Sequence, residues 1–400
     1  MKYVVILGDG MADRAIAELG GKTPLEAAKK PNIDKLAARA TVGMTQTLRD
    51  GMPLGSDVAN LSVLGYEPSQ CYSGRSPIEA LGVGLHINDD DIVLRCNIVN
   101  IDLKEPFEES IMIDHSSDKI TDEEAEELFK YLNEQLGTET LRFYSGASYR
   151  GITMWRGVKN DFDNTPPHDI LRRCIKDYLP KGAYAKELTE LTKKSAELLS
   201  KHPVNLDRVK RGLRPANCIW LWGEGTKPNI GSFREKYGKS GTIITAVPLL
   251  KGLGVGMGLD TPFIEGATGD IHTNYKGKAD AAISAITERD FVFIHVEAPD
   301  ECGHDGDTAG KVRSIELIDE NIVGPVVNAL ESCGESYRIL VMPDHATPIC
   351  ERTHTIDEIP FLMYDSEKET AGVECYCERL ASETGFRIAN GCDIMNEFFK

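Results

Sequence analysis

The chain has 400 residues, of which 41% are hydrophobic and 27% are charged, and its formal net charge is -18. This length predicts two domains or one large α/β domain with an insertion, and the negative charge argues against a nucleic-acid or anionic-membrane surface, because such surfaces require dense Lys and Arg. No stretch reaches the ~18 apolar residues that a membrane span needs, and the ten cysteines are scattered without a CxxC pair, which predicts reduced thiols in the cytoplasm.

Short apolar runs that end in polar or glycine-rich turns predict buried strands. The first run, Tyr3–Leu7, meets Asp9 almost at once and is too short for a signal peptide. Five further runs of this kind are Cys218–Trp222, Ile243–Val247, Phe291–Val296, Ile339–Met342 and Phe361–Tyr364. Apolar residues at helical spacing occupy Glu187–His202 and Ala309–Leu330. The alternation of strands and helices predicts an α/β fold with a mostly parallel sheet covered by helices.

The segment from residue 73 to about residue 180 has a different pattern. Asp91–Ile101 alternates like a strand, and an acidic helix is expected to begin at Thr121, because Glu124 follows three residues later as in a capping box. Prolines at 166 and 167 then interrupt the chain. We therefore predict a smaller inserted α+β domain at 73–180, which binds substrate, and a metal-binding core domain formed by 1–72 and 181–400.

Potential metal ligands follow three of the predicted strands. They are Asp9, the pair Asp300 and His304, and the pair Asp344 and His345, with His354 nine residues further on. Ligands gather at the carboxyl ends of strands in α/β sheets, so these side chains are expected to converge. Carboxylates with imidazoles suit Zn, Mn or Fe better than Mg, and six ligands suffice for two ions. A single Asp or His in such a place is more often a turn or structural residue, so the prediction depends on their joint occurrence. His295 and Glu297 flank this group and are expected to support it.

A candidate nucleophile precedes a predicted helix. Ser56 follows the turn at 50–55 and begins an apolar helical pattern through Leu61 and Leu64. Unpaired amides at a helix N-terminus attract a phosphate, and a bound metal ion can activate a serine hydroxyl. The alternative is that Ser56 is only an N-cap, which is a common position for serine.

Taken together, these segments resemble the archaeal-type cofactor-independent phosphoglycerate mutases, which belong to the alkaline phosphatase superfamily. The resemblance covers essentially the whole chain. The motifs that carry it are Leu7-Gly8-Asp9-Gly10, Gly55-Ser56-Asp57-Val58-Ala59-Asn60, Ser73-Gly74-Arg75-Ser76-Pro77-Ile78-Glu79-Ala80, Thr165-Pro166-Pro167-His168-Asp169, Ile219-Trp220-Leu221-Trp222-Gly223, Glu297-Ala298-Pro299-Asp300 with His304, and Asp344-His345.

The resemblance implies an alkaline-phosphatase-like core and an isomerase that interconverts 3-phosphoglycerate and 2-phosphoglycerate through a phosphoserine at Ser56. It implies two divalent ions, Mn, Zn or Mg. One is expected to be held by Asp9, Ser56, Asp344 and His345, and the other by Asp300, His304 and His354. A lid-like second domain would trap the glycerate. Arginine suits bidentate recognition of carboxylate and phosphate. The expected substrate contacts are Asn60, Arg75, Arg95, Arg150, His168 and, more weakly, Lys278.

Two stretches depart from the family pattern and leave the acceptor open. Asp114–Ile120 stands where a glycine-containing turn is expected, and Gly151 where a histidine is expected. The partner is in any case a small phosphorylated hydroxy acid. One alternative is a phosphatase, or a phosphotransferase acting on another small hydroxy acid such as homoserine; the chain has no P-loop, which disfavours a P-loop kinase. Another is a non-enzymatic acidic metal-binding protein.

Overall fold

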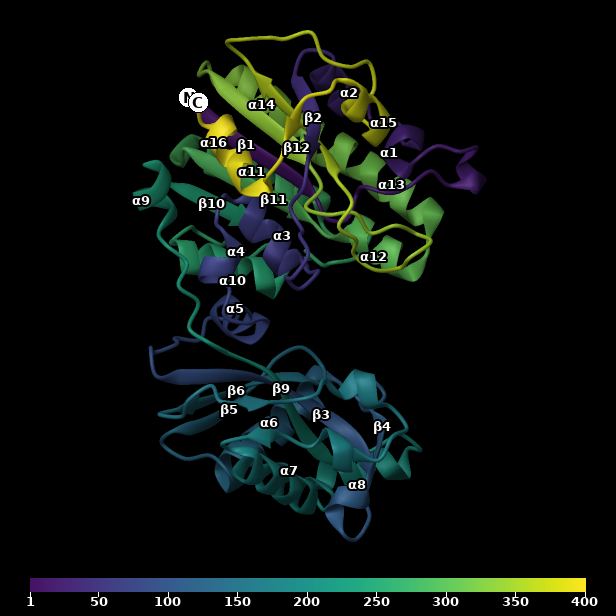
Figure 1. Cartoon of the computed structure of the whole chain (residues 1–400), viewed down its shortest axis with the longest axis vertical. Helices are drawn as coiled ribbons and strands as arrows, with labels where there is room; N and C mark the ends of the chain where they lie inside the picture. The colour runs from purple at the N-terminus through teal and green to yellow at the C-terminus, as the bar shows by residue number, and fades with distance from the viewer. The chain divides into compact units, whose positions relative to one another are not determined.

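The computed structural model describes all 400 residues, which form two compact units (Figure 1). The first unit comprises 1–72 and 229–400, and the second comprises 73–228. The insert therefore begins where the sequence predicts, but it ends at Pro228 instead of residue 180. The predicted strand at Cys218 and the predicted helix at Glu187 exist, but both lie in the second unit, because the strand pairs with Asp91–Asp102 and the helix packs on that sheet.

The first unit contains most of the strands predicted for the core. Its strands are β1 (Lys2–Gly8), β2 (Thr41–Thr45), β10 (Gly241–Ile244), β11 (Phe291–Val296), β12 (Tyr337–Met342), β13 (Ile359–Asp365) and β14 (Arg387–Ile388). Its helices are α1 (Pro24–Ala27), α2 (Pro31–Ala37), α3 (Ser56–Val63), α4 (Pro68–Cys71), α9 (Phe233–Tyr237), α10 (Pro248–Met257), α11 (Tyr275–Glu288), α12 (Ala298–Asp305), α13 (Thr308–Ile318), α14 (Gly324–Ser332), α15 (Glu378–Glu383) and α16 (Ile394–Phe398). The long helix predicted over Ala309–Leu330 is interrupted by a π-helical segment, Asp319–Val323, between α13 and α14.

The seven strands form one mixed sheet in the order β10-β11-β1-β12-β13-β2-β14. Its first four strands are parallel, whereas β13 runs antiparallel to both β12 and β2. The strand interiors are buried on both faces, as expected for parallel strands covered by helices. The predicted α/β class with a mostly parallel, helix-covered sheet is confirmed.

Alternate side chains of the central strands enter two different layers. Val4 and Ile6 of β1 join a core to which α2, α11, α13, α14 and α15 contribute. On the opposite face, the Phe291 ring stacks on Phe233 of α9, with ring centroids 4.7 Å apart. This two-sided cover leaves the ends of the strands as the places where polar side chains can gather.

The second unit has its own sheet and core, in keeping with the predicted α+β insert. Its elements are α5 (Arg75–Gly82), β3 (Asp91–Asp102), β4 (Ile111–Asp114), α6 (Asp122–Gln135), β5 (Leu141–Ser145), β6 (Arg150–Arg156), β7 (Phe162–Asp163), β8 (Lys181–Gly182), α7 (Ala185–Leu199), α8 (Pro203–Lys210) and β9 (Cys218–Thr226). The strand β3 pairs antiparallel with β4, β6 and β9. Helices α6 and α7 lie along this sheet (Figure 1). Their Leu128 and Leu188 are buried in one core with residues of these strands. Thr121 caps α6 as predicted, accepting a hydrogen bond from the Glu124 amide.

No helix of the structure combines the length and the apolar character needed to cross a bilayer.

Candidate active site

The strand ends that carry potential metal ligands meet at one edge of the seven-stranded sheet. Strands β11, β1 and β12 are neighbours and run parallel, so their carboxyl ends lie together. Asp9 follows β1, Asp344 follows β12, and α12 begins just after β11. Residues that are some 290 to 340 positions apart in sequence therefore share one site, with Gly10 donating its amide to Asp344 Oδ1 at 3.2 Å.

Asp9, Asp344 and His345 form the first group of potential ligands. Their ligand atoms lie within 4.8 Å of one another and all three residues are buried. His345 Nε2 is 3.3 Å from Asp9 Oδ1 and 3.5 Å from Asp344 Oδ2. Ser56 joins this group, because its Oγ lies 3.2 Å from the same imidazole nitrogen.

Asp300, His304 and His354 form the second group, again with ligand atoms within 4.8 Å of one another. Asp300 and His304 are four residues apart on α12 and face the same side, with His304 Nε2 3.1 Å from Asp300 Oδ2. His354 reaches the group because Thr355 folds back to bond the Ala346 carbonyl, and its Nε2 lies 3.0 Å from that of His304.

Two glycines permit the close approach of these segments. Gly10 has φ +59°, and a Cβ there would lie 2.6 Å from Asp300 Oδ1. A Cβ on Gly303 would lie 2.7 Å from the Thr347 carbonyl oxygen. Both contacts are shorter than carbon and oxygen tolerate, so any side chain would separate the loop after β1, helix α12 and the loop after β12.

Ser56 is the first residue of α3, and Gly55 before it is the N-cap. Ser56 is therefore not the N-cap of this helix, contrary to the alternative interpretation of the sequence. The Ser56 side chain is half-buried, as a nucleophile that must meet a substrate requires. One turn later, the buried Asn60 donates its Nδ2 to the Ser56 carbonyl at 2.9 Å and to Asp344 Oδ2 at 2.7 Å. Asn60 thus links the helix start to the first ligand group.

Three supporting side chains lie behind the ligands. Thr347 donates its hydroxyl to Asp300 Oδ1, with its oxygen also 3.2 Å from His345 Nδ1. His295 places Nε2 2.8 Å from Asp9 Oδ2, and its Nδ1 is 3.1 Å from the Thr245 hydroxyl. The sequence pointed to His295, but not to the two threonines. Their only sequence signal is that each lies just beyond a buried strand, two residues from a ligand in the case of Thr347.

The electrostatics of the site are dominated by buried carboxylates of like charge. Burial raises the pKa of Asp9 well above its ordinary value, and the negative charges of Asp344, Asp300 and Glu297 raise it further. One of its oxygens, Oδ1, is buried without a hydrogen-bond partner. Such an arrangement is costly unless cations compensate it.

The second group is balanced by its imidazoles. Burial opposes ionisation of Asp300, but hydrogen bonds from His304 and His354 hold the pKa of this carboxyl well below its usual range. The same contact raises the pKa of His304 to about 9. Burial lowers the pKa of His345, which favours the neutral imidazole that ligates metals.

These residues fit divalent cations in two adjacent groups. The donors are carboxylate oxygens, imidazole nitrogens and one serine hydroxyl, a set suited to borderline divalent ions. The unpartnered oxygen of Asp9 and the crowding of four acidic side chains supply the negative charge that such ions would neutralise. The remaining imidazole hydrogen bonds, such as His304 Nδ1 to the Arg352 carbonyl at 3.0 Å, orient the rings as second contacts of ligands do.

The second unit gathers several of the predicted substrate residues around an aromatic cluster. Arg95 on β3 lies over the Trp222 ring, with its guanidinium carbon 4.6 Å from the centroid, and it forms a two-point ion pair with Glu79 of α5. Arg75 also bonds Glu79. Both guanidinium groups are thus anchored to one carboxylate. Burial opposes ionisation of Glu79, but the charges and hydrogen bonds of Arg95 and Arg75 lower its pKa.

Arg150 and His168 lie around a further histidine that the sequence motifs did not single out. His115 packs its ring 5.5 Å from Tyr149 and 6.1 Å from His168, measured between centroids, and its buried Nδ1 has no hydrogen-bond partner. Arg150 is exposed, and its guanidinium carbon lies over the Tyr149 ring, 4.6 Å from the ring centroid. His115 could have been found from its place in the stretch Asp114–Ile120, which departs from the family pattern.

Lys278 is placed differently from the expectation. It lies on α11, is fully buried, and donates its ammonium to the His295 carbonyl at 3.1 Å. Burial lowers its pKa to about 8, against the opposing charge of Glu297. The side chain therefore supports the end of β11 and does not face solvent.

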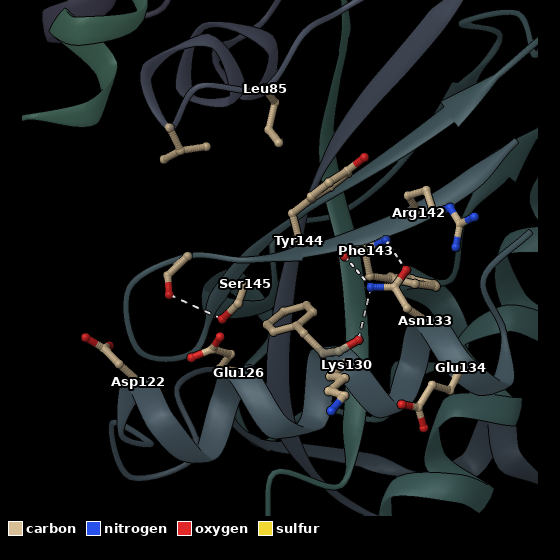
Figure 2. Close-up of a pocket in the computed structure, with 13 residues that line it drawn as sticks. Leu85, Asp122, Glu126, Lys130, Asn133, Glu134, Arg142, Phe143, Tyr144 and Ser145 are labelled. Carbon is tan, nitrogen blue, oxygen red and sulfur yellow. Dashed lines mark hydrogen bonds between the residues drawn. The ribbon is translucent and has the colours of Figure 1, made fainter. Parts of the chain in front are cut away.

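A groove of about 830 Å³ lies elsewhere in the second unit, between α6 and β5 (Figure 2). Figure 2 shows the acidic side chains of Asp122, Glu126 and Glu134 along α6, with Arg142 on the facing strand. None of the predicted substrate residues lines this groove. Its size alone does not make it the active site, since its two cationic side chains, Lys130 and Arg142, share the lining with these three carboxylates.

Comparisons with known proteins point to one family. A family model described as 2,3-bisphosphoglycerate-independent phosphoglycerate mutase matches residues 37–205. The 2,3-bisphosphoglycerate-independent phosphoglycerate mutase of Methanosarcina barkeri is 44% identical over 402 residues, which cover 100% of both chains. That of Methanosarcina acetivorans is 45% identical over 402 residues, again with 100% of both chains covered.

Solved structures resemble the whole chain as well. The PH0037 protein from Pyrococcus horikoshii has 32% identity and a TM-score of 0.82, with 99% of this chain and 96% of that chain covered. A cofactor-independent phosphoglycerate mutase from Thermoplasma acidophilum has 26% identity and a TM-score of 0.70, with 100% and 99% covered.

Proposed function

The chain belongs to the 2,3-bisphosphoglycerate-independent phosphoglycerate mutase family, and from this premise we propose that it interconverts 3-phosphoglycerate and 2-phosphoglycerate through a phosphoserine at Ser56. Membership makes the protein an isomerase that needs no bisphosphoglycerate cofactor. The observation that carries the phosphoserine route is the position of Ser56, half-buried at a helix start and 3.2 Å from His345 within the acidic ligand group.

Two divalent cations, Mn, Zn or Mg, would be held by the two ligand groups. Asp9, Ser56, Asp344 and His345 would hold one, and Asp300, His304 and His354 would hold the other. When bound, such ions lower the cost of gathering negative charge at the phosphoryl group and at the serine oxygen. Asn60 and Thr347 keep Asp344 and Asp300 in their positions through the hydrogen bonds described above.

Ser56 performs the covalent step. Its Oγ loses a proton and forms a bond to phosphorus, while the bond from phosphorus to the substrate oxygen breaks. The substrate oxygen takes up a proton and stays on the glycerate as a hydroxyl. Ser56 begins α3, and the positive end of the helix dipole favours an anion next to Oγ. After the glycerate has turned, its other hydroxyl loses its proton and attacks phosphorus. The bond between phosphorus and Oγ breaks, Oγ takes up a proton, and the net reaction moves the phosphoryl group from one hydroxyl oxygen of the glycerate to the other.

The glycerate must stay bound while Ser56 carries the phosphoryl group, because its loss would leave hydrolysis as the only outcome. Arg75, Arg95, Arg150 and His168 are our candidates for holding its carboxylate and phosphate, and His115 joins them. Arginine forks are suited to both anions. Asn60 is buried and Lys278 is fully enclosed, so for these two we propose positioning of the ligand groups instead of contact with the substrate.

The proposal can be tested by trapping the intermediate. Metal-loaded protein is mixed with 3-phosphoglycerate without added bisphosphoglycerate, quenched in acid, and digested for mass spectrometry. A phosphoryl group on Ser56, together with 2-phosphoglycerate seen by phosphorus NMR, is the expected result. Conversion without any phosphoserine would contradict the covalent route, whereas free phosphate in place of 2-phosphoglycerate would make the protein a phosphatase. Transfer to homoserine or another added hydroxy acid would identify a phosphotransferase.

A further inference from the structure

A pair of cysteines in the first unit faces a buried ammonium group, away from the ligand groups. Lys30 is fully buried at the start of α2, and its Nζ donates to Cys375 Sγ at 3.2 Å. Cys377 follows two residues later, and its thiol interacts with the Cys375 sulfur. Cys375 is half-buried and Cys377 is buried. Neither residue takes part in the proposed reaction, so the sulfur–ammonium contact needs another explanation.

The position of Lys30 is fixed from the other side. Its Nζ lies 3.0 Å from Asp34 Oδ1, and that same oxygen accepts the backbone N–H of Tyr376 at 2.9 Å. The ammonium therefore cannot turn away from Cys375 without breaking an ion pair inside the protein. A fixed cation next to a sulfur favours the thiolate, which is the reactive form of cysteine. The Cys377 thiol, followed by Lys30, lowers the pKa of Cys375 to about 6, although burial and the negative charge of Asp34 oppose this.

The backbone holds the two sulfurs together. Tyr376 between them is fully buried, and its hydroxyl donates to the carbonyls of Pro360 at 2.7 Å and Val341 at 3.2 Å. Upstream, Val373 donates its amide to the Ala37 carbonyl at 3.0 Å. Because the segment is anchored on both β12 and β13 and on the end of α2, Cys375 and Cys377 remain neighbours while one of them stays accessible.

We propose that Cys375 is a peroxide-reactive thiolate that, once oxidised, closes a disulfide with Cys377. In the first step the Cys375 sulfur attacks hydrogen peroxide; an S–O bond forms, the O–O bond breaks, and the sulfur becomes a sulfenic acid as hydroxide leaves. In the second step the Cys377 sulfur attacks this sulfenic sulfur; the S–S bond forms, the S–O bond breaks, and the proton of Cys377 leaves with the oxygen as water. The two thiols lose two electrons, and peroxide is reduced to two waters.

The first test measures the reactivity of each cysteine in the full-length, metal-loaded protein. Iodoacetamide is applied between pH 5 and pH 9.5, and the labelled peptides are counted by mass spectrometry. The exposed Cys333 and Cys350 serve as references in the same molecule. A thiolate of low pKa has more anion but less nucleophilicity than an ordinary thiol, and the two effects together predict about five-fold faster labelling at pH 6.5. Cys375 should outpace both references at that pH, and its rate should level off above about pH 7.

The matched variant is Lys30→Met, which removes the cation and keeps the length of the side chain. It should shift the labelling profile of Cys375 to higher pH while those of Cys333 and Cys350 stay unchanged. If this variant does not fold, the wild-type profile still decides, because accessibility scales a rate without changing the pH at which it levels off. A Cys375 rate that keeps rising to pH 9 with Cys350 would overturn the proposal.

The second test follows oxidation. With a few equivalents of hydrogen peroxide, the tryptic peptide 369–379 should lose the mass of two hydrogens, and a reductant should restore them. Cys377→Ser should stop the reaction at a sulfenic acid that dimedone captures on Cys375, whereas Cys350→Ser should leave disulfide formation intact. Peroxide that oxidises Cys333 or Cys350 first, or a Cys377→Ser variant without a dimedone adduct on Cys375, would contradict the assignment.

Discussion

The two units solve the problem of buried charge in opposite ways. The strand-end site of the first unit gathers Asp9, Asp300 and Asp344. Asp300 is paired with His304 and His354, whereas the neighbouring negative charges raise the pKa of Asp9. The aromatic cluster of the second unit gathers arginines, and each has a partner, as Arg95 has in Glu79 and Trp222. The first arrangement leaves negative charge that bound cations would neutralise, whereas the arginines of the second have partners within the protein. Chemistry that needs metal is therefore expected in the first, and recognition of an anion in the second.

The largest effect is expected at Ser56, the nucleophile that we propose for the first unit. Ser56→Ala should reduce turnover by roughly 10³-fold or more, because a missing nucleophile removes the whole covalent route. Progress is followed by coupled assay with 3-phosphoglycerate. Ser69→Ala, an exposed serine of α4, is the matched control and should stay near the wild type. Near-normal turnover of Ser56→Ala would contradict a phosphoserine intermediate at this residue.

Removal of a metal ligand should have the next largest effect and should be confined to the first unit. His304→Ala is expected to lower the bound metal from two ions to one and turnover by at least about 100-fold. Protons compete with cations at His304, whose pKa the Asp300 contact raises to about 9, so metal affinity should rise as the pH increases towards 9.

Elemental analysis and titration of metal into chelated protein check both statements about His304. The control is His272→Ala, since His272 is exposed and its backbone amide only bonds Asp270. Unchanged metal content in His304→Ala would remove the second ligand group from the proposal.

The strand-end site was largely predictable because each of its strands can be recognised from its own residues. Apolar runs such as Phe291–Val296 are legible without knowledge of their neighbours, and parallel strands must present their carboxyl ends together. The pairing of Cys218–Thr226 with β3 could not be predicted from the sequence, because side-chain packing across the sheet determines which strands pair. This explains why the insert was predicted too short.

Side-chain environments were the least predictable. Lys278 was expected near the substrate, but the turn of α11 directs it to the His295 carbonyl inside the protein. Thr347 gives no more signal than any threonine after a strand, and only the fold shows that it bonds Asp300. The contact between Lys30 and Cys375 joins segments 345 residues apart, so no local pattern announces it.

Two exposed arginines on neighbouring strands, Arg150 on β6 and Arg142 on β5, test whether the second unit binds the anionic substrate. Arg150→Ala should raise KM by roughly ten-fold or more and leave phosphoserine formation at saturating substrate largely intact, because a charge-assisted hydrogen bond is lost from binding. Arg142→Ala on β5 is the matched control, since Arg142 is exposed in the groove of Figure 2 and should not affect KM. Equal effects of both variants would reduce Arg150 to a contribution to overall charge.

The smallest expected effect tests whether the second unit satisfies its own charges. Asp114, beside His115, is deeply placed; burial alone would raise its pKa, but the amides of Asp118 and Ser116, the Ser116 hydroxyl and Arg214 lower it to about 2. An unfolded Asp titrates near 3.9. The contribution of this carboxylate is therefore present above about pH 4 and is lost as the pH falls from there towards 2, an effect of about 1–2 kcal/mol.

Asp114→Asn should remove that dependence, so the difference between wild type and variant in the free energy of unfolding should be largest near pH 6 and should shrink as the pH falls towards 2. Tryptophan fluorescence in urea isolates the relevant unit, because all three tryptophans, Trp155, Trp220 and Trp222, lie between 73 and 228. Chelation of metal should leave this transition unchanged, since the charges here are balanced within the protein. A fluorescence transition that moved with metal removal would mean that the two units do not handle charge independently, and the contrast between them would fail.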